Sequence, residues 1–158
     1  MIFVTVGHQM PFDRLLHLVD MWAEKSGCTD IFAQIGTGDY IPKNFQSRPF
    51  LSIDEFECYL SESTAIVAHA GTGTIIKTLY HGKPLLVLPR LGALGETRND
   101  HQVGTARHFS ETGQILMADD DSDFLGKMDT LMSFIPSRGI GVDGSSNLIK
   151  KITQFIEQ

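Results

Sequence analysis

The fold is decided by one stretch near the middle of the chain, Ile66-Val67-Ala68-His69-Ala70-Gly71-Thr72-Gly73-Thr74-Ile75. Its apolar beginning is typical of a strand buried on both faces, and the apolar residues that follow the turn recur at helical spacing. Gly71 and Gly73 let the backbone come close to a ligand, and Thr72 or Thr74 can cap the helix. Because the first amides of a helix and its dipole favour an anion, the turn is predicted to hold the phosphates of a nucleotide.

Glycine also occurs in such turns for conformational reasons alone, and for this turn by itself that alternative stays open. Two familiar nucleotide motifs do not fit. Gly82-Lys83 is followed by Pro84 instead of the Ser or Thr of a Walker A loop. The Gly71-x-Gly73 pair lacks the third glycine and the downstream carboxylate of a dinucleotide fingerprint. Nicotinamide chemistry and ATP hydrolysis are therefore not indicated.

Composition suggests one globular domain: 158 residues, 42% hydrophobic and 20% charged, suit a single core over 1–158. The net charge of −6 gives no reason to expect a nucleic-acid partner. The sequence has neither a membrane-spanning apolar run nor a signal peptide, so a cytoplasmic protein is expected. Cys28 and Cys58 have no partner at metal-ligand spacing and are predicted to be buried, reduced thiols.

Strand-like and helix-like segments alternate, which predicts an α/β fold: a Rossmann-like parallel sheet with helices on both faces. The predicted strands are 2–6, 31–35, 50–52, 65–68, 85–88 and 115–117. The predicted helices are 12–25, 54–61 with Asp54 as its cap, 72–81, 100–112, 122–134 and 147–156. The segment 139–146 has the composition of a linker.

Ligands of such sheets bind beyond the carboxyl ends of the strands, where this chain places its unusual loops. These loops are Gly7-His8-Gln9-Met10-Pro11-Phe12, Gly36-Thr37-Gly38, His69–Thr74, and Pro89-Arg90 through Gly95-Glu96 to His101-Gln102. Several glycine turns on one rim strengthen the prediction of a nucleotide site there.

The motifs of these loops resemble the donor-binding half of the GT-B glycosyltransferases, the family 28 C-terminal domain. The matching residues are Phe3–Gly7, Pro11–Leu15, His69–Ile75, Gly82-Lys83-Pro84, Pro89-Arg90, Gly95-Glu96 and Asn99–Gln102. Within the family the chain is most similar to single-domain subunits, such as the catalytic subunit of the dolichol-linked N-acetylglucosaminyltransferase and related bacterial exopolysaccharide subunits.

The resemblance implies transfer of a sugar, with inversion and without a cofactor or a metal, from a UDP-sugar to a polyprenyl-diphosphate-linked acceptor. It implies that Gly71, Thr72, Gly73 and Thr74 hold the diphosphate, with Gly7 and His8 approaching from the first loop. His101 and Gln102 would meet the sugar, and Glu96 would lie in the loop that closes over it. His8 and Glu96 are the candidate catalytic residues, although His8 can equally serve to orient the loop, because larger family members supply the catalytic base from the other domain.

For three residues and one acidic segment, a structural role stands beside a role in ligand binding. His69 either contacts the donor or orients the neighbouring loops, and Arg90 either pairs with the diphosphate or anchors the long loop that follows it. Lys77 falls where two-domain relatives place a ribose-binding glutamate, and a solvated lysine is the simpler interpretation. The acidic run Asp119–Asp123 is predicted to cap a helix and not to bind metal.

A GT-B enzyme works between two domains, so a donor half of this length implies a partner. The expected partner is a membrane-anchored subunit that binds the lipid-linked acceptor and holds this chain at the inner face of the membrane. The predicted last helix has an apolar face that either docks the partner or completes the domain's own core: Leu148, Ile149, Ile152, Phe155 and Ile156. The alternative is a non-catalytic module that binds a nucleotide sugar. An epimerase-like enzyme is a further candidate, but the length of the chain argues against it because an epimerase needs both halves of the cleft in one polypeptide.

Overall fold

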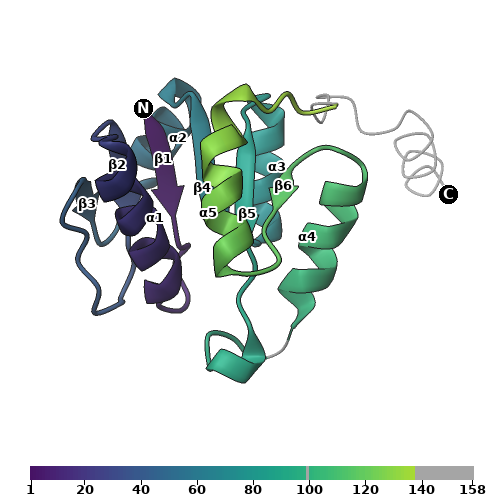
Figure 1. Cartoon of the computed structure of the whole chain (residues 1–158), viewed down its shortest axis with the longest axis horizontal. Coiled ribbons are helices and arrows are strands. Elements are labelled where there is room, and N and C mark those ends of the chain that lie inside the picture. Colours follow the sequence, from purple (N-terminus) through teal and green to yellow (C-terminus); the bar gives the residue numbers. More distant parts are fainter. Residues whose placement is uncertain (99, 138–158) are drawn as a thin grey trace, which may run out of the picture.

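The computed structural model describes residues 1–98 and 100–137. Strands and helices alternate along the chain, as Figure 1 shows. The strands are β1 (Ile2–Thr5), β2 (Ile31–Gln34), β3 (Gln46–Arg48), β4 (Ala65–His69), β5 (Leu85–Leu88) and β6 (Leu116–Met117). The helices are α1 (Asp13–Ser26), α2 (Ile53–Glu62), α3 (Thr72–Tyr80), α4 (His101–Glu111) and α5 (Asp121–Thr130), with 3₁₀ turns η1 (Gly92–Leu94) and η2 (Leu131–Ser133). The predicted linker 139–146 and helix 147–156 lie outside the described residues.

The strands form one six-stranded parallel sheet in the order β3-β2-β1-β4-β5-β6. Strand β1 lies between β2 and β4, with Val4 opposite Ala33 and Val67. The order of connection reverses between β1 and β4, and sheets of this kind bind ligands at the carboxyl ends of the strands on either side of that reversal. The predicted Rossmann-like α/β fold is confirmed, and the topology brings the loops after β1 and β4 together.

Helices cover both faces of the sheet because alternate strand residues point to opposite sides. On one face Val4 and its neighbours pack against α1 and α5, the two helices in front of the sheet in Figure 1. On the other face Phe3 and Ile66 pack against α2, α3 and α4. The central strands β1, β4 and β5 are buried almost throughout, which is why their sequences are continuously apolar.

Two predictions around β3 and α2 are wrong. The edge strand is Gln46–Arg48 and not 50–52, because it pairs only with β2 and its polar residues face solvent, leaving no hydrophobic pattern to find. Helix α2 is capped by Ser52 and not Asp54. The Ser52 hydroxyl accepts from the Glu55 amide, and the Glu55 carboxylate accepts from the Ser52 amide, so the two residues form a capping box.

The other helix and strand boundaries in the described residues lie within one residue of prediction, except that α5 ends at Thr130 and gives way to the η2 turn. The predicted acidic cap is confirmed, since Asp120 accepts from the Asp123 amide at the start of α5. The cysteines are free thiols, but Cys58 is exposed and Cys28 only half-buried, so the prediction of buried thiols is wrong. Cys58 is exposed because α2 buries only Leu60 fully.

A buried carboxylate fixes the loop between β2 and β3. Asp20 of α1 accepts hydrogen bonds from the Tyr40 hydroxyl at 2.7 Å and from the backbone amides of Lys43 and Asn44. Burial opposes its ionisation, but these donors outweigh that effect and lower the pKa of Asp20. Asp20 therefore ties the segment that follows Gly36 to α1. Within the described residues no helix is long and apolar enough to cross a membrane.

Candidate functional site

The loops that leave β1, β4 and β5 surround a cavity of about 340 Å³ at the carboxyl end of the sheet. Most of the residues predicted for the site line this cavity: Gly7, His8, His69, Gly71, Gly73, Thr74, Arg90, His101 and Gln102, together with Gln9. Two predicted residues do not line it. These are Thr72, the first residue of α3, and Glu96, whose side chain is turned towards Arg14 of α1. The sheet topology thus brings together residues that are up to 95 positions apart in the sequence.

Helix α3 presents an uncapped N-terminus to the cavity. Its N-cap is Gly71, which has no side chain, and the structure gives no side-chain cap. The prediction that Thr72 or Thr74 caps the helix is therefore wrong. The first helical bond runs from the Ile75 amide to the Gly71 carbonyl at 3.0 Å, so the amides of Thr72, Gly73 and Thr74 precede it. These amides and the helix dipole form a site suited to a phosphate.

The glycines of the site differ in what surrounds them. A Cβ on Gly71 would lie 2.3 Å from Nε2 of His69, and a Cβ on Gly7 would lie 2.7 Å from Cε1 of the same ring. Gly7 also has a φ of +78°, which L side chains rarely adopt. Around Gly73, by contrast, a Cβ would meet no atom within 4 Å. Gly7 and Gly71 are thus needed for packing, whereas Gly73 faces the open space of the site.

His69 fills the space between the two glycine turns. Burial, and next the nearby positive charge of Arg90, lower the pKa of His69 to about 4, although a backbone hydrogen bond with Thr5 acts in the opposite direction. Nδ1 of His69 is buried without a hydrogen-bond partner among the described residues. The imidazole is therefore neutral near pH 7. Its contacts favour the role of orienting the loops over that of a charged ligand group.

We expect the free energy of unfolding to fall as the pH is lowered from about 6.5 towards 4. The unfolded chain takes up a proton on His69 near the ordinary pKa of 6.5, whereas the folded protein does so only near 4. In this window the unfolded state binds more protons, so stability drops by up to about 1.4 kcal/mol per pH unit. Urea unfolding across this range should show the slope in the wild type and in the exposed control His17→Gln. A His69→Gln variant that keeps the full slope would contradict the assignment.

Arg90 anchors the loop that follows β1. Its side chain is only 4% exposed, and Nη2 donates to the carbonyls of Val6 at 2.7 Å and Met10 at 2.5 Å. The guanidinium also lies over the Phe12 ring, 5.1 Å from its centroid. The Arg90 amide donates to Oε1 of Gln102 at 3.3 Å, which links the start of the loop after β5 to α4. The Arg90 side chain thus acts as an anchor, but it holds the first loop and not, as predicted, the long loop that follows Arg90.

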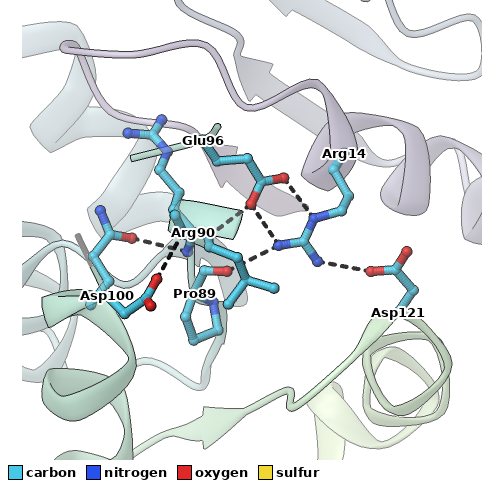
Figure 2. Close-up of polar contacts among 9 residues, drawn as sticks. Arg14, Pro89, Arg90, Glu96, Asp100 and Asp121 are labelled. Carbon is cyan, nitrogen blue, oxygen red and sulfur yellow. Dashed lines mark hydrogen bonds and ion pairs between the residues drawn. The ribbon is translucent and has the colours of Figure 1, made fainter. Parts of the chain in front are cut away.

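Glu96 is bound to an arginine that the sequence analysis did not single out. Its carboxylate accepts hydrogen bonds from Nε of Arg14 at 2.7 Å, from Nη2 of Arg14 at 2.8 Å and from the Leu91 amide at 3.0 Å (Figure 2). The Glu96 side chain is 12% exposed and is turned towards α1. No sequence signal could have paired these residues, which lie 82 positions apart. The proposed contact of Glu96 with the sugar stays a prediction.

A second cavity, of about 240 Å³, adjoins the first and shares Gly7, His8, Gly73 and Thr74 with it. Its other lining residues are Thr5, Leu51, Ser52, Ile53, Phe56 and Lys77. Leu51 and Ser52 fall in the segment 50–52, which was wrongly predicted to be a strand. Lys77 is 44% exposed, forms an ion pair with Glu57 and lies over the Phe56 ring. It is therefore a paired lysine at the rim of this apolar cavity. The described residues contain no cluster of three or more His, Cys, Asp or Glu side chains suited to a metal ion.

Comparison with known proteins assigns the family. Residues 1–123, which include the whole cavity lining, match the family model described as the glycosyltransferase family 28 C-terminal domain. The chain belongs to the glycosyltransferase family 28 C-terminal domain family. Its relatives include the UDP-N-acetylglucosamine transferase subunit ALG13 of Homo sapiens, which is 30% identical over an alignment of 124 positions that covers 72% of this chain and 10% of that protein. The Mus musculus protein of the same name is 29% identical over 123 residues, with the same coverage. The chain thus matches about a tenth of the length of these relatives.

Solved structures with the same fold include ALG13, MurG and an epimerase. An NMR structure of ALG13 superposes with a TM-score of 0.62 at 18% identity, covering 99% of this chain and 96% of that one. Acinetobacter baumannii MurG gives a TM-score of 0.61 at 17% identity, covering 84% of this chain and 42% of that one. A putative UDP-N-acetylglucosamine 2-epimerase from Listeria monocytogenes gives a TM-score of 0.65 at 14% identity, covering 99% of this chain and 45% of that one. At these identities the likeness concerns the fold, which therefore does not choose between glycosyl transfer and epimerisation.

Proposed function

We propose that this protein is the donor-binding, catalytic subunit of a two-component inverting glycosyltransferase that uses a UDP-sugar. The observation that carries the proposal is the uncapped N-terminus of α3, which lies between two adjoining cavities. A nucleoside diphosphate sugar has the matching sequence of parts: an aromatic base with ribose, two phosphates and a sugar. Family membership, and relatives named UDP-N-acetylglucosamine transferase subunit, support the same donor class.

The lining of each cavity suggests which part of the donor it takes. The smaller cavity has an apolar wall of Leu51, Ile53 and Phe56, which suits the nucleoside. The diphosphate would lie on the shared wall, against the first amides of α3. The sugar would then extend into the larger cavity, towards His101 and Gln102.

In this arrangement the protein's main chemical contribution is to stabilise the leaving group. When the acceptor hydroxyl attacks the anomeric carbon, the bond to the diphosphate oxygen breaks and negative charge builds up on UDP. Amides already oriented at the start of α3, together with the helix dipole, would stabilise that charge. His8 lines both cavities and stacks on Phe50, with 5.8 Å between the ring centroids. We propose His8 as a group that can accept the proton from the acceptor hydroxyl, a role that the partner subunit could also fill.

The proposal extends to the acceptor and to the partner. The acceptor would be a polyprenyl-diphosphate-linked sugar used in exopolysaccharide or glycolipid synthesis. A membrane-anchored subunit would hold that acceptor and keep this chain at the cytoplasmic face of the membrane. The word "subunit" in the names of the curated relatives supports a heteromeric enzyme.

Co-expression with a neighbouring membrane subunit, followed by a UDP-release assay, tests the proposal. We expect UDP release that requires the partner, a UDP-sugar and a lipid-linked acceptor together. Binding of UDP-sugars without turnover under any of these conditions would indicate a non-catalytic module. Conversion of the UDP-sugar to its epimer without an acceptor would indicate an epimerase. Either of these last results would overturn the proposed transfer reaction.

A further inference from the structure

The loop between β5 and α4 is held in place by a nearly buried ion pair. Arg14, in the first turn of α1, binds Glu96 in the middle of this loop through two nitrogen–oxygen contacts (Figure 2). The side chains are 16% and 12% exposed. The hydrogen bond to Glu96 raises the pKa of Arg14, against the opposing effect of burial. A two-point contact between charged, largely desolvated groups fixes direction as well as distance.

The same pair holds the beginning of the loop. Nη2 of Arg14 donates to the Pro89 carbonyl at 3.1 Å, and Glu96 accepts the Leu91 amide at 3.0 Å. A second carboxylate, Asp100, accepts the Gly92 amide at 2.7 Å and so ties the end of the loop to its first turn. Figure 2 shows these contacts converging on the segment that follows Pro89.

Asp100 directly precedes α4, whose first two residues, His101 and Gln102, line the larger cavity. The loop that the ion pair holds is therefore continuous with the wall of the cavity. Gln102 is also bound to the Arg90 amide, at the start of the same loop. Any displacement of the loop would move both residues relative to the first amides of α3, which belong to a different strand–helix unit.

We propose that Arg14 and Glu96 are positioning residues that set the sugar-binding wall of the donor site without touching the donor. This inference rests on the proposed function, because it assumes that the larger cavity takes the sugar. It assigns to Glu96 a role different from that of a catalytic acid or base, and it adds Arg14 to the functional residues. The ion pair acts on the sugar end of the donor alone, because the nucleoside cavity is lined by β1, α2, α3 and the loops next to them.

The test compares the binding of UDP with that of UDP-sugars by the full chain. Calorimetry first measures the wild type with UDP, UDP-N-acetylglucosamine, UDP-glucose, UDP-galactose and UDP-glucuronate, and the sugar nucleotide that binds best is carried forward. We expect Arg14→Gln and Glu96→Gln each to reduce its affinity about tenfold, as expected when a well-placed hydrogen bond is lost. The affinity for UDP itself should stay within about twofold, because its site is built from other elements.

Three further variants distinguish positioning from other roles. Arg14→Lys keeps the charge but not the two-point contact, and it should lie between Arg14→Gln and the wild type. The double variant Arg14→Gln/Glu96→Gln should be no worse than the weaker-binding single variant, because both residues act through one contact. Asp121→Asn is the matched control. It removes the charge of the outer partner of Arg14, and the Asp121 side chain is 55% exposed.

The possible failures separate the two proposals. A wild-type chain that binds neither UDP nor any UDP-sugar would overturn the proposed function and this inference with it. A wild type that binds both, beside folded variants that keep the wild-type ratio of the two affinities, would overturn only the inference. Equal losses of UDP and UDP-sugar affinity would show that the ion pair supports the fold generally. Additive losses in the double variant would show that Glu96 contacts the donor directly.

Discussion

Gly73→Val is expected to lower the affinity for UDP at least about 100-fold while the protein remains folded. Gly73 is in the first turn of α3 and lines both cavities. A Cβ at this position meets no protein atom within 4 Å, so a valine fits the folded chain. The added methyl groups would instead occupy the space over the first helical amides, which the diphosphate needs for close approach. Calorimetry with UDP measures the loss, and thermal unfolding confirms that the fold is intact.

Gly126→Val is the matched control for this substitution. Gly126 lies within α5, also with no atom within 4 Å of a Cβ, but it borders a groove between α1 and α5 on the other face of the sheet. Both variants introduce the same β-branched side chain into a helix. The control should bind UDP like the wild type. If Gly73→Val also retained wild-type affinity, the turn would be a structural feature and not a phosphate site.

Gly7→Ala is expected to destabilise the fold by about 3 kcal/mol and to abolish UDP binding. A positive φ costs an L-residue about 1–2 kcal/mol, and crowding against a packed side chain costs a similar amount. Both costs apply here, because Gly7 has a φ of +78° and its Cβ would lie 2.7 Å from the half-buried His69 ring. Relief of the clash would move either the first loop or His69, and both line the larger cavity. Urea unfolding measures the loss of stability.

Gly27→Ala separates the two costs. Gly27 ends α1 with a φ of +71°, close to that of Gly7, but nothing lies within 4 Å of its Cβ. This variant should lose only the backbone contribution, about 1–2 kcal/mol, and bind UDP normally. In a His69→Ser background, Gly7→Ala should cost less than it does in the wild type, because the clashing ring is gone. Equal costs for Gly7→Ala and Gly27→Ala would show that His69 does not constrain the turn.

The parts of the fold that sequence could predict are those that local pattern determines. The buried strand at Ile66, the glycine turn and the amphipathic α3 were all recognisable, because a continuous apolar run before the turn gives way to apolar residues at helical spacing after it. Strand β3 was not, since Gln46–Arg48 is polar and pairs on one side only. The cap of α2 was misassigned because Ser52 and Asp54 are both suitable residue types, and only the hydrogen bond from Glu55 distinguishes them.

The site was predictable where it consists of loops that follow strands. In a parallel sheet all of these loops leave the same edge, where ligands of such sheets bind. Contacts between side chains of distant elements were not predictable. Arg14 could not be connected with Glu96, nor Lys77 with Glu57, because such pairs depend on how the helices are oriented against the sheet. The second cavity was missed for another reason: its wall includes Leu51, Ser52 and Ile53, which lead into α2, whereas the sequence predicted a strand at 50–52.

The central claim is that a nucleotide diphosphate binds across the start of α3, and amide NMR of the ¹⁵N-labelled full chain during a titration with UDP tests it most directly. We predict that the largest shifts occur at the amides of Thr72, Gly73 and Thr74, with a second group at Gly7 and in the loop that follows it. Amides in the groove between α1 and α5 should not move. Saturable UDP binding that leaves the amides of Thr72–Thr74 unshifted, or no binding at all, would contradict the account.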